Sequence, residues 1–367
     1  MSDDRFIKPE GIYLLSHSIG LAPAGARAQA DTEFFDIWKK NTPDAWSFWL
    51  SSIDRFRAAL GDLFNSPAGN FCPQANLSSA LTKIIYGLPR DSGRSTILLT
   101  EDAFPSIGFV VDRAKTQGFN VRFIPTQRDA SDPNTWDEYL TDDVGLALIT
   151  HVHSNTSLRL PVGDIAALAR ERGIVSIVDI AQSAGIVPID FADWNADFVI
   201  GSCVKWLCGG PGAGYLWVNT DIVEQCQPVD VGWFSHADPF EFDIHHFEYA
   251  DKAMRFWGGT PSILPFIVAR HSVELIRSIG VENIQQHNHT LSRKIANAVD
   301  DDALVSPRDG DRGGTVVLNL GARQPDVAER LATARVHCDS RATGMRLSPH
   351  IYNTAEEVDA AIGCLID

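Results

Sequence analysis

Residues 199–217 read VIGSCVKWLCGGPGAGYLW, an apolar run that contains one lysine and then breaks into a glycine-rich loop. Lys205 interrupts the run, and four glycines and one proline follow within residues 209–214. A solvated lysine before a glycine turn would explain this pattern without any chemistry. A lysine at the buried end of a strand would instead have a lowered pKa, and its amine could form an imine with an aldehyde or ketone.

Apolar runs of strand length alternate with amphipathic stretches on both sides of this lysine. The expected strands are 95–100, 119–126, 144–152, 174–181, 196–204 and 214–218, and the expected helices between them are 108–116 and 161–172. Strands that are apolar on both faces and separated by helices are typical of a mostly parallel sheet covered on both sides. The sequence therefore predicts an α/β fold.

The pattern changes after Pro261. Helices are expected over 263–279 and 281–299, followed by a short strand within 314–320 and a closing helix with Thr354 at its N-cap. We interpret this part as a smaller α/β domain, formed by residues 1–44 together with 261–367. Residues 45–260 would form the larger domain.

Polar side chains follow three of the expected strands in the larger domain. They are Thr150–His153, Asp179–Gln182 and Lys205. Ligands of open α/β sheets bind at the carboxyl ends of the strands, so these residues are expected to meet in one crevice.

Asp179 follows the run IVSIV (174–178), which is apolar except for Ser176. A carboxylate in that position is costly to bury without a cationic partner. The protonated ring nitrogen of pyridoxal 5'-phosphate (PLP) would be such a partner, and the aspartate would maintain the ring as an electron sink. A helix N-cap would also explain an aspartate here. Together with Lys205, Asp179 makes PLP a leading hypothesis.

Three further positions fit a PLP site, and each has an ordinary structural explanation. Ser78 and Ser79 stand where a helix begins, so they could hold an anion or simply cap the helix. Phe104 could stack on a flat ring or belong to the core. Arg346 could bind a substrate carboxylate with its planar guanidinium or lie on the surface.

Composition excludes several classes of partner. The chain has 31 basic and 47 acidic residues, a net charge of −16, which disfavours nucleic acid and anionic membranes. No apolar window approaches the length of a membrane span, and residues 1–11 lack the features of a signal peptide. Six scattered cysteines indicate reduced thiols in a cytoplasmic protein.

A metal site is not expected. His151 and His153 could share one strand face, and His245 and His246 add two imidazoles, but no carboxylate or cysteine spacing completes a ligand set. The glycine-rich loop is not followed by Lys-Ser or Lys-Thr, so it is not a nucleotide-binding P-loop.

Several segments, in matching order along the chain, resemble kynureninase and more broadly the class V aminotransferase superfamily of fold-type I PLP-dependent enzymes. The segments are IYLLSHSIGLAP (12–23), AFPS (103–106), VDIAQSAGIVPIDF (178–191), DFVIGSCVKWLCGGPGAGYLWV (197–218), GWFSHADPFEF (232–242), RFWGGTPSIL (255–264) and RLSPHIYNTAEEVDAAI (346–362). The resemblance implies a large domain with a mostly parallel seven-stranded sheet between helices, plus a smaller α/β domain. It also implies a homodimer whose active site is shared between subunits.

The resemblance assigns a role to each candidate residue. Lys205 would carry PLP as a Schiff base, Asp179 would pair with the pyridine nitrogen, and Phe104 would stack on the ring. The other expected cofactor contacts are Leu77, Ser78, Thr150, Gln182, Trp233 and Thr260, with Thr260 contributed by the partner subunit. Arg346 would bind the α-carboxylate of an amino-acid substrate.

Departures from kynureninase leave the reaction open. Val204 stands where kynureninases usually have a tyrosine, Gln182 replaces a histidine and Ile107 replaces an aspartate. We expect hydrolytic or β-lyase cleavage of an L-amino-acid side chain. The alternatives are aminotransfer, racemisation or epimerisation, and a non-catalytic protein with this fold. Four tryptophans hint at an aromatic pocket, namely Trp46, Trp49, Trp233 and Trp257.

Overall fold

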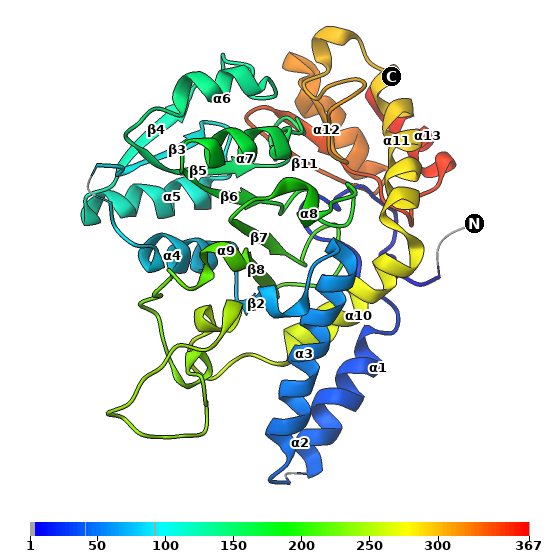
Figure 1. Ribbon diagram of the computed structural model, residues 1–367. Coiled ribbons are helices and arrows are strands. Elements are labelled where there is room, and N and C mark those ends of the chain that lie inside the picture. The colour runs from blue at the N-terminus through cyan, green and yellow to red at the C-terminus, as the bar shows by residue number, and fades with distance from the viewer. Residues whose placement is uncertain (1–3, 41, 92, 367) are drawn as a thin grey trace.

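A seven-stranded sheet forms the centre of the computed structural model, which describes residues 4–40, 42–91 and 93–366 (Figure 1). In order across the sheet, the strands are β2 (Phe71–Gln74), β8 (Gly214–Val218), β7 (Phe198–Ser202), β6 (Val175–Asp179), β5 (Val144–Thr150), β3 (Thr96–Thr100) and β4 (Asn120–Ile124). β8 is antiparallel to both of its neighbours, and the other pairs are parallel. The predicted mostly parallel seven-stranded sheet is confirmed.

Helices cover both faces of this sheet. One face packs against α3 (Ala45–Phe64), α6 (Pro133–Tyr139), α7 (Val162–Glu171), α8 (Phe191–Trp194) and α10 (Leu264–Ile279), and the other against α4 (Leu77–Gly87), α5 (Pro105–Ala114) and α9 (Thr220–Val223). Side chains of a strand point alternately to the two faces. In β5, Ala147 and Ile149 enter the first core while Leu146 and Leu148 enter the second. This double burial explains why the strands are apolar at nearly every position.

A second, antiparallel sheet lies in the C-terminal part of the chain. It consists of β11 (Asp339–Arg341), β12 (Gly344–Leu347) and β9 (Val316–Leu318), and it packs with α11 (Val281–Asn297), α12 (Gln324–Thr333) and α13 (Ala355–Ile366). The N-terminal segment joins this region because β1 (Ile12–Tyr13) pairs in parallel with β10 (Val336–His337). Thr354 is the expected N-cap of α13, since its Oγ1 accepts a hydrogen bond from the Glu357 amide at 3.2 Å.

The N-terminal segment also contributes helices that the sequence analysis did not assign. They are α1 (Ala26–Ala30), the π-helical turn η1 (Asp31–Phe35) and α2 (Asp36–Lys40), which lie beside α3 and α10 in Figure 1. Glu33 forms ion pairs with Arg55 of α3 and Arg270 of α10, which ties this segment to the large sheet. The division at residues 44/45 and 260/261 stays a prediction, and residues 1–3 and 41 lie outside the described ranges. Within those ranges, no helix is long and apolar enough to cross a membrane.

Candidate active site

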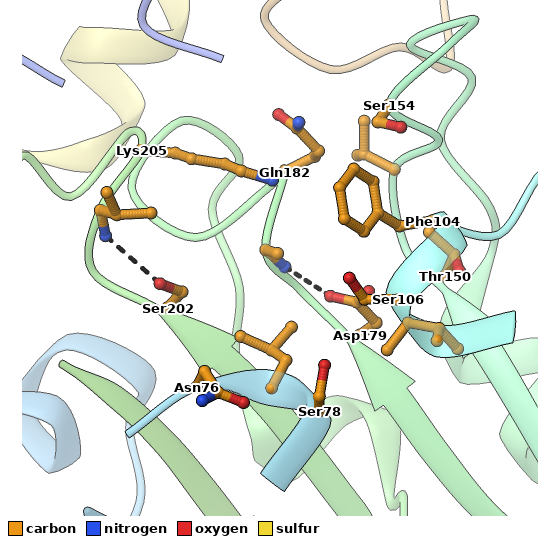
Figure 2. A pocket seen from close by; sticks show the side chains of 15 residues that line it. Asn76, Ser78, Phe104, Ser106, Thr150, Ser154, Asp179, Gln182, Ser202 and Lys205 are labelled. Atoms are coloured by element: carbon orange, nitrogen blue, oxygen red, sulfur yellow. Dashed lines mark hydrogen bonds between the residues drawn. The ribbon is translucent and has the colours of Figure 1, made fainter. Parts of the chain in front are cut away.

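The predicted site residues meet at the carboxyl ends of three neighbouring strands. Thr150 pairs in register with Asp179, and Lys205 follows three residues after the end of β7. They border a cavity of about 210 Å³, shown in Figure 2. Its walls are formed by Asn76, Leu77, Ser78, Phe104, Ser106, Ile107, Thr150, Val152, Ser154, Asp179, Ala181, Gln182, Ser202, Val204 and Lys205.

The backbone around Lys205 is fixed by tight local contacts. Gly210 and Gly212 adopt φ values of +72° and +91°, which favour glycine, so the loop can turn back into β8. The N-terminal segment crosses directly above the lysine, where the Gly20 amide donates a hydrogen bond to the Val204 carbonyl at 2.8 Å. A Cβ at position 20 would lie 2.2 Å from the Lys205 carbonyl oxygen. A glycine at position 20 therefore permits this close approach.

Burial shifts the ionisation of both Lys205 and Asp179. Lys205 as a whole residue is partly exposed, but its amine lies deep in the protein, and burial lowers its pKa to about 8 against the opposing attraction of Asp179. Arg346 and Arg341 lower it further. Burial also raises the pKa of Asp179, whose Oδ1 accepts a hydrogen bond from the Ala181 amide at 2.8 Å. The site thus holds a reactive amine and a carboxylate that a cation in the cavity would stabilise.

Phe104 presents its ring to the amine of Lys205. It is the N-cap residue of α5, and Pro105 begins the helix behind it. The Lys205 Nζ lies 5.4 Å from the ring centroid, and the Cζ of Arg341 lies 5.6 Å from it. Figure 2 shows Lys205 pointing across the cavity toward this ring. A flat cofactor attached to Lys205 would therefore lie within reach of an aromatic face.

The opposite wall offers polar groups suited to an anion. Helix α4 begins at Leu77, one residue earlier than expected, and its N-cap is Asn76, whose side chain accepts from the Ser79 amide at 2.9 Å. Leu77 and Ser78 line the cavity at this helix N-terminus. The Thr150 hydroxyl is buried and has no hydrogen-bond partner within the described residues. These donors fit a phosphate group better than an apolar ligand.

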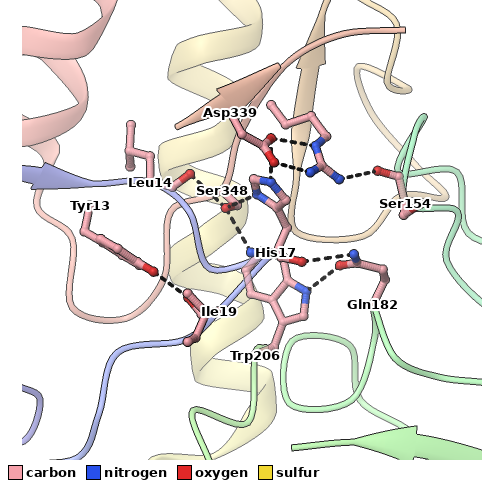
Figure 3. Close-up of polar contacts among 10 residues, drawn as sticks. Tyr13, Leu14, His17, Ile19, Ser154, Gln182, Trp206, Asp339 and Ser348 are labelled. Carbon is pink, nitrogen blue, oxygen red and sulfur yellow. Dashed lines mark hydrogen bonds and ion pairs between the residues drawn. The ribbon is translucent and has the colours of Figure 1, made fainter. Parts of the chain in front are cut away.

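Arg346 lies behind the cavity wall instead of on it. Its side chain is 0% exposed, and it forms a two-pronged ion pair with Asp339, with Nε 2.8 Å from Oδ1 and Nη2 close to Oδ2. Its Nη1 donates to the Ser154 carbonyl at 3.2 Å, as Figure 3 shows. A substrate carboxylate would have to approach the part of the guanidinium that Asp339 leaves uncovered.

His17 completes this buried network. Its Nε2 lies 2.9 Å from Asp339 Oδ1 and its Nδ1 lies 2.6 Å from the Ser348 hydroxyl. Burial lowers the pKa of His17 to about 4, so the ring is neutral near pH 7. Burial alone would raise the pKa of Asp339. Hydrogen bonds from His17 and Arg346 outweigh burial and hold this pKa well below its usual range.

Gln182 lines the cavity, but its amide is already engaged. Its Nε2 donates to the His17 carbonyl at 3.1 Å, and its Oε1 accepts from Trp206 Nε1 at 3.2 Å. The side chain therefore links the N-terminal segment to the indole that follows Lys205.

Two predicted cofactor contacts are not brought to this cavity within one chain. Trp233 and Thr260 are absent from its walls, and Trp233 packs instead against Trp46 at 5.7 Å and Phe234 at 4.2 Å between ring centroids. Trp49 also contacts Trp46. Trp257 joins the same group through Phe234 at 5.0 Å between ring centroids, so all four tryptophans belong to one aromatic cluster, which is separate from the walls of the Lys205 cavity.

The two histidines considered as a metal pair bind different partners. His151 Nδ1 lies 2.9 Å from the Ser183 hydroxyl, and His153 Nε2 lies 3.3 Å from the Thr100 hydroxyl. Burial lowers the pKa of His151 to about 3 and that of His153 to about 4. Within the described residues, neither belongs to a cluster able to hold a metal ion.

Several residues of the site were missed in the sequence analysis. They are Asn76, Ser106, Ser154 and Ser202 on the cavity wall, Arg341 beside Phe104, and His17 and Asp339 around Arg346. The segment 339–346 contains an aspartate and two arginines near one another. That charge pattern could have indicated Asp339 and Arg341 as site residues. An isolated serine has no pattern in the sequence that distinguishes a site residue from a surface residue.

Comparison with known proteins assigns this site to a family. Residues 75–361 match the family described as aminotransferase class-V. The chain belongs to this family. A kynureninase from Bacillus thuringiensis subsp. konkukian is 30% identical over 96% of this chain and 87% of its own length. An uncharacterized aminotransferase, YcbU of Bacillus subtilis, is 28% identical over 86% of this chain and 84% of its own length. The predicted kynureninase-like class V membership is confirmed.

Solved structures agree on the fold. The cystine C-S lyase C-DES superposes with a TM-score of 0.89 at 21% identity, covering 98% of both chains. A cysteine desulfurase from Thermococcus onnurineus NA1 gives a TM-score of 0.86 at 22% identity, covering 97% of this chain and 94% of that one. The fold-type I architecture is thereby confirmed.

The family and the cavity agree on PLP as the cofactor. The buried Lys205 amine matches the aldehyde of PLP, and the buried Asp179 carboxylate matches its ring nitrogen. The Phe104 ring matches the flat pyridine ring, and the unpartnered Thr150 hydroxyl matches the phosphate. Lys205, Asp179, Phe104 and the N-terminus of α4 are the groups that would hold it.

We expect the PLP-free protein to capture added PLP at a rate that rises with pH and has its midpoint near 8, because only the neutral amine of Lys205 attacks an aldehyde. An ordinary lysine would give a midpoint near ~10.4. Stopped-flow absorbance measures this rate between pH 6 and pH 10, a range that extends about two pH units to either side of the expected midpoint. A rate still rising steeply at the upper limit would contradict the lowered pKa.

Proposed function

We propose that this chain is a PLP-dependent enzyme that cleaves the side chain of an L-amino acid, by hydrolysis or by β-elimination. The observation that carries the proposal is the buried amine of Lys205, set beside the Asp179 carboxylate and the Phe104 ring. Similarity to kynureninases over nearly the whole chain supports cleavage at the side chain. When bound, PLP supplies an electron sink for the negative charge that develops at Cα.

Each residue then has a defined task. Lys205 would anchor the cofactor through its amine, and the same amine would serve as the base that takes the proton from Cα of the substrate. Asp179 would place a negative charge beside the ring nitrogen and so favour its protonated form. Phe104 would offer an aromatic face to the ring. Arg346, oriented by Asp339, receives the substrate carboxylate on its uncovered donors.

The few ionisable side chains on the cavity wall favour a reaction in which one group acts first as base and then as acid. Lys205 and Asp179 are the only ionisable side chains among the described residues that line it. After Lys205 has taken the Cα proton, it can give that proton to a leaving group on Cβ as the bond electrons depart with that group. Hydrolysis of a Cβ–Cγ bond would also require an activated water, for which the second subunit would have to supply the base.

Transfer of sulfur to a cysteine of the enzyme is not supported. No cysteine lines the described cavity wall. Burial raises the pKa of Cys203 and Cys208, which flank Lys205, so both remain unreactive thiols.

Product analysis tests the proposal. The PLP-loaded protein is incubated separately with L-kynurenine, L-cysteine and L-alanine, and the products are separated by chromatography. Anthranilate with alanine from kynurenine identifies hydrolysis, whereas sulfide with pyruvate and ammonia from cysteine identifies elimination. If alanine is the only one of the three that is consumed, side-chain cleavage is overturned. Aminotransfer is established if, without an added keto acid, the alanine consumed only equals the amount of enzyme.

Aminotransfer is the second candidate. It is supported by the similarity to YcbU and by Val204, which lines the cavity where kynureninases usually have a tyrosine. Aminotransfer returns the proton to the cofactor and needs no further acid beyond Lys205.

We also propose that the active site is completed in a homodimer. Trp233 and Thr260 lie outside the cavity of their own chain, and the segment between them exposes Phe240, Phe242 and Ile244 by 49%, 73% and 92%. Exposed apolar groups in such number indicate a surface that another chain covers. Light scattering should give twice the mass of the 40.2 kDa chain. A monomeric mass with full activity would contradict a shared site.

The compartment is part of the same proposal. All six cysteines are free, and four of them are buried. Thiols persist in this form in a reducing compartment, which supports a cytoplasmic location.

A further inference from the structure

A loop far from Lys205 brings together three side chains with metal-ligand chemistry. The segment between α9 and the 3-10 helix η5 (Lys252–Phe256) forms an open loop at the end of the sheet near β2 (Figure 1). It carries His236, Glu241 and His246, and one ligand atom of each lies within 4.8 Å of the others. Among the described residues, this is the one cluster of three such groups.

His236 has a nitrogen that the protein leaves without a partner. Its side chain is 9% exposed, and its Nε2 is buried with no hydrogen bond within the described residues. This nitrogen faces Glu241 Oε2 at 3.6 Å, which is too long for a hydrogen bond. Leaving such a group without a partner is unfavourable, so a ligand at Nε2 would stabilise it.

The contacts of the other ring nitrogen are compatible with either tautomer of His236. Nδ1 lies 2.8 Å from the Asp238 carbonyl oxygen, and the Asp238 amide donates to the same nitrogen at 2.9 Å. With a metal ion at Nε2, the ring proton would sit on Nδ1 and be donated to the Asp238 carbonyl, and the Asp238 amide would lose Nδ1 as its acceptor. A backbone carbonyl in this position is the usual support for a metal-bound histidine.

Glu241 stands between the two histidines. Its Oε2 faces His236, and its Oε1 lies 2.6 Å from His246 Nδ1. Two ligands of a tetrahedral zinc ion with bonds of about 2.0–2.1 Å are separated by roughly 3.3 Å, so the observed separations need only small side-chain shifts. His246 is 55% exposed and Glu241 33%, which leaves both side chains room to adjust.

We propose that His236, Glu241 and His246 form a zinc-binding site. Two imidazoles and one carboxylate are a ligand set that zinc accepts, with water or a further group in the fourth position. The same loop carries Trp233, which contacts Phe240 and Phe242. A zinc ion would therefore fix the loop that presents these aromatic side chains. Zinc would take no part in the chemistry at Lys205, and it would bear on the proposed shared site only through the position of Trp233.

Zinc retention by matched histidine variants tests this site. The full-length, PLP-loaded protein is treated with a chelator, exchanged into micromolar zinc, passed through a desalting column and analysed by mass spectrometry for bound zinc. His246→Ala and Glu241→Gln remove ligands, whereas His245→Ala removes the adjacent exposed imidazole that lies outside the cluster. All three positions are exposed or nearly so, and circular dichroism checks that each variant is folded.

We expect the unsubstituted protein and His245→Ala to retain about one zinc ion per chain, and the two ligand variants to lose at least about tenfold in zinc affinity. Zinc bound through PLP or cysteine would be equal in all four proteins. Equal retention by all four, retention by either ligand variant, or no zinc in the unsubstituted protein would overturn the proposal.

Discussion

Replacing Lys205 with alanine should lower turnover by at least about 10³-fold, because the variant loses the amine that we propose as both the anchor of PLP and the base at Cα. The absorbance band of bound PLP should change at the same time, since the cofactor would no longer be attached to the protein. Lys205→Arg retains a positive charge but supplies no neutral amine near pH 7, so it should be equally inactive. Steady-state rates and absorbance spectra of both variants measure these effects.

Chemical rescue separates loss of chemistry from loss of structure. The cavity left by Lys205→Ala should admit a small amine such as methylamine, which would act as the missing base and restore part of the lost rate. Lys205→Arg fills the same space and should not be rescued. Circular dichroism and urea unfolding of the PLP-free alanine variant check that its loss of activity does not come from loss of the fold. Full activity in Lys205→Ala would contradict a catalytic role for Lys205 and would leave only the fold in common with PLP-dependent enzymes.

The centre of the site was predictable because it depends on single strands. Each of β5, β6 and β7 is an apolar run that ends in a polar residue, and parallel strands bring such ends to one edge. Thr150 and Asp179 therefore become neighbours through register alone. The lysine and its glycine-rich loop follow the next strand in the same way.

The surroundings of Arg346 could not be predicted in this way. His17 contacts Asp339 across 322 positions of the chain, and no local pattern indicates that contact. The same limit applies to β2, a four-residue strand that contains Pro73 and joins the sheet by pairing with the far strand β8. The aromatic cluster around Trp46 is a third case, since tryptophan spacing does not distinguish a pocket from a core.

The ion pair of Arg346 with Asp339 should be the most sensitive contact outside the cofactor cavity. Arg346 is 0% exposed, so Asp339→Ala would leave a buried guanidinium with the Ser154 carbonyl as its main remaining acceptor. Removal of one partner from a fully buried pair costs about 3–5 kcal/mol, and Asp339 is 33% exposed. The free energy of unfolding of the PLP-free protein, measured in urea, should therefore fall by more than about 1 kcal/mol and by no more than about 5 kcal/mol.

An exposed pair provides the matched control. Arg159 and Asp311 are 33% and 67% exposed, so Asp311→Ala should change the free energy of unfolding by less than about 1 kcal/mol. Asp339→Asn keeps an acceptor for the guanidinium and should lose less than Asp339→Ala. Because Asp339 also orients the guanidinium that we propose receives the substrate carboxylate, Asp339→Asn should raise KM more than it lowers kcat. Equal stability of Asp339→Ala and Asp311→Ala would show that Arg346 finds other partners, and the carboxylate would then have no part in positioning it.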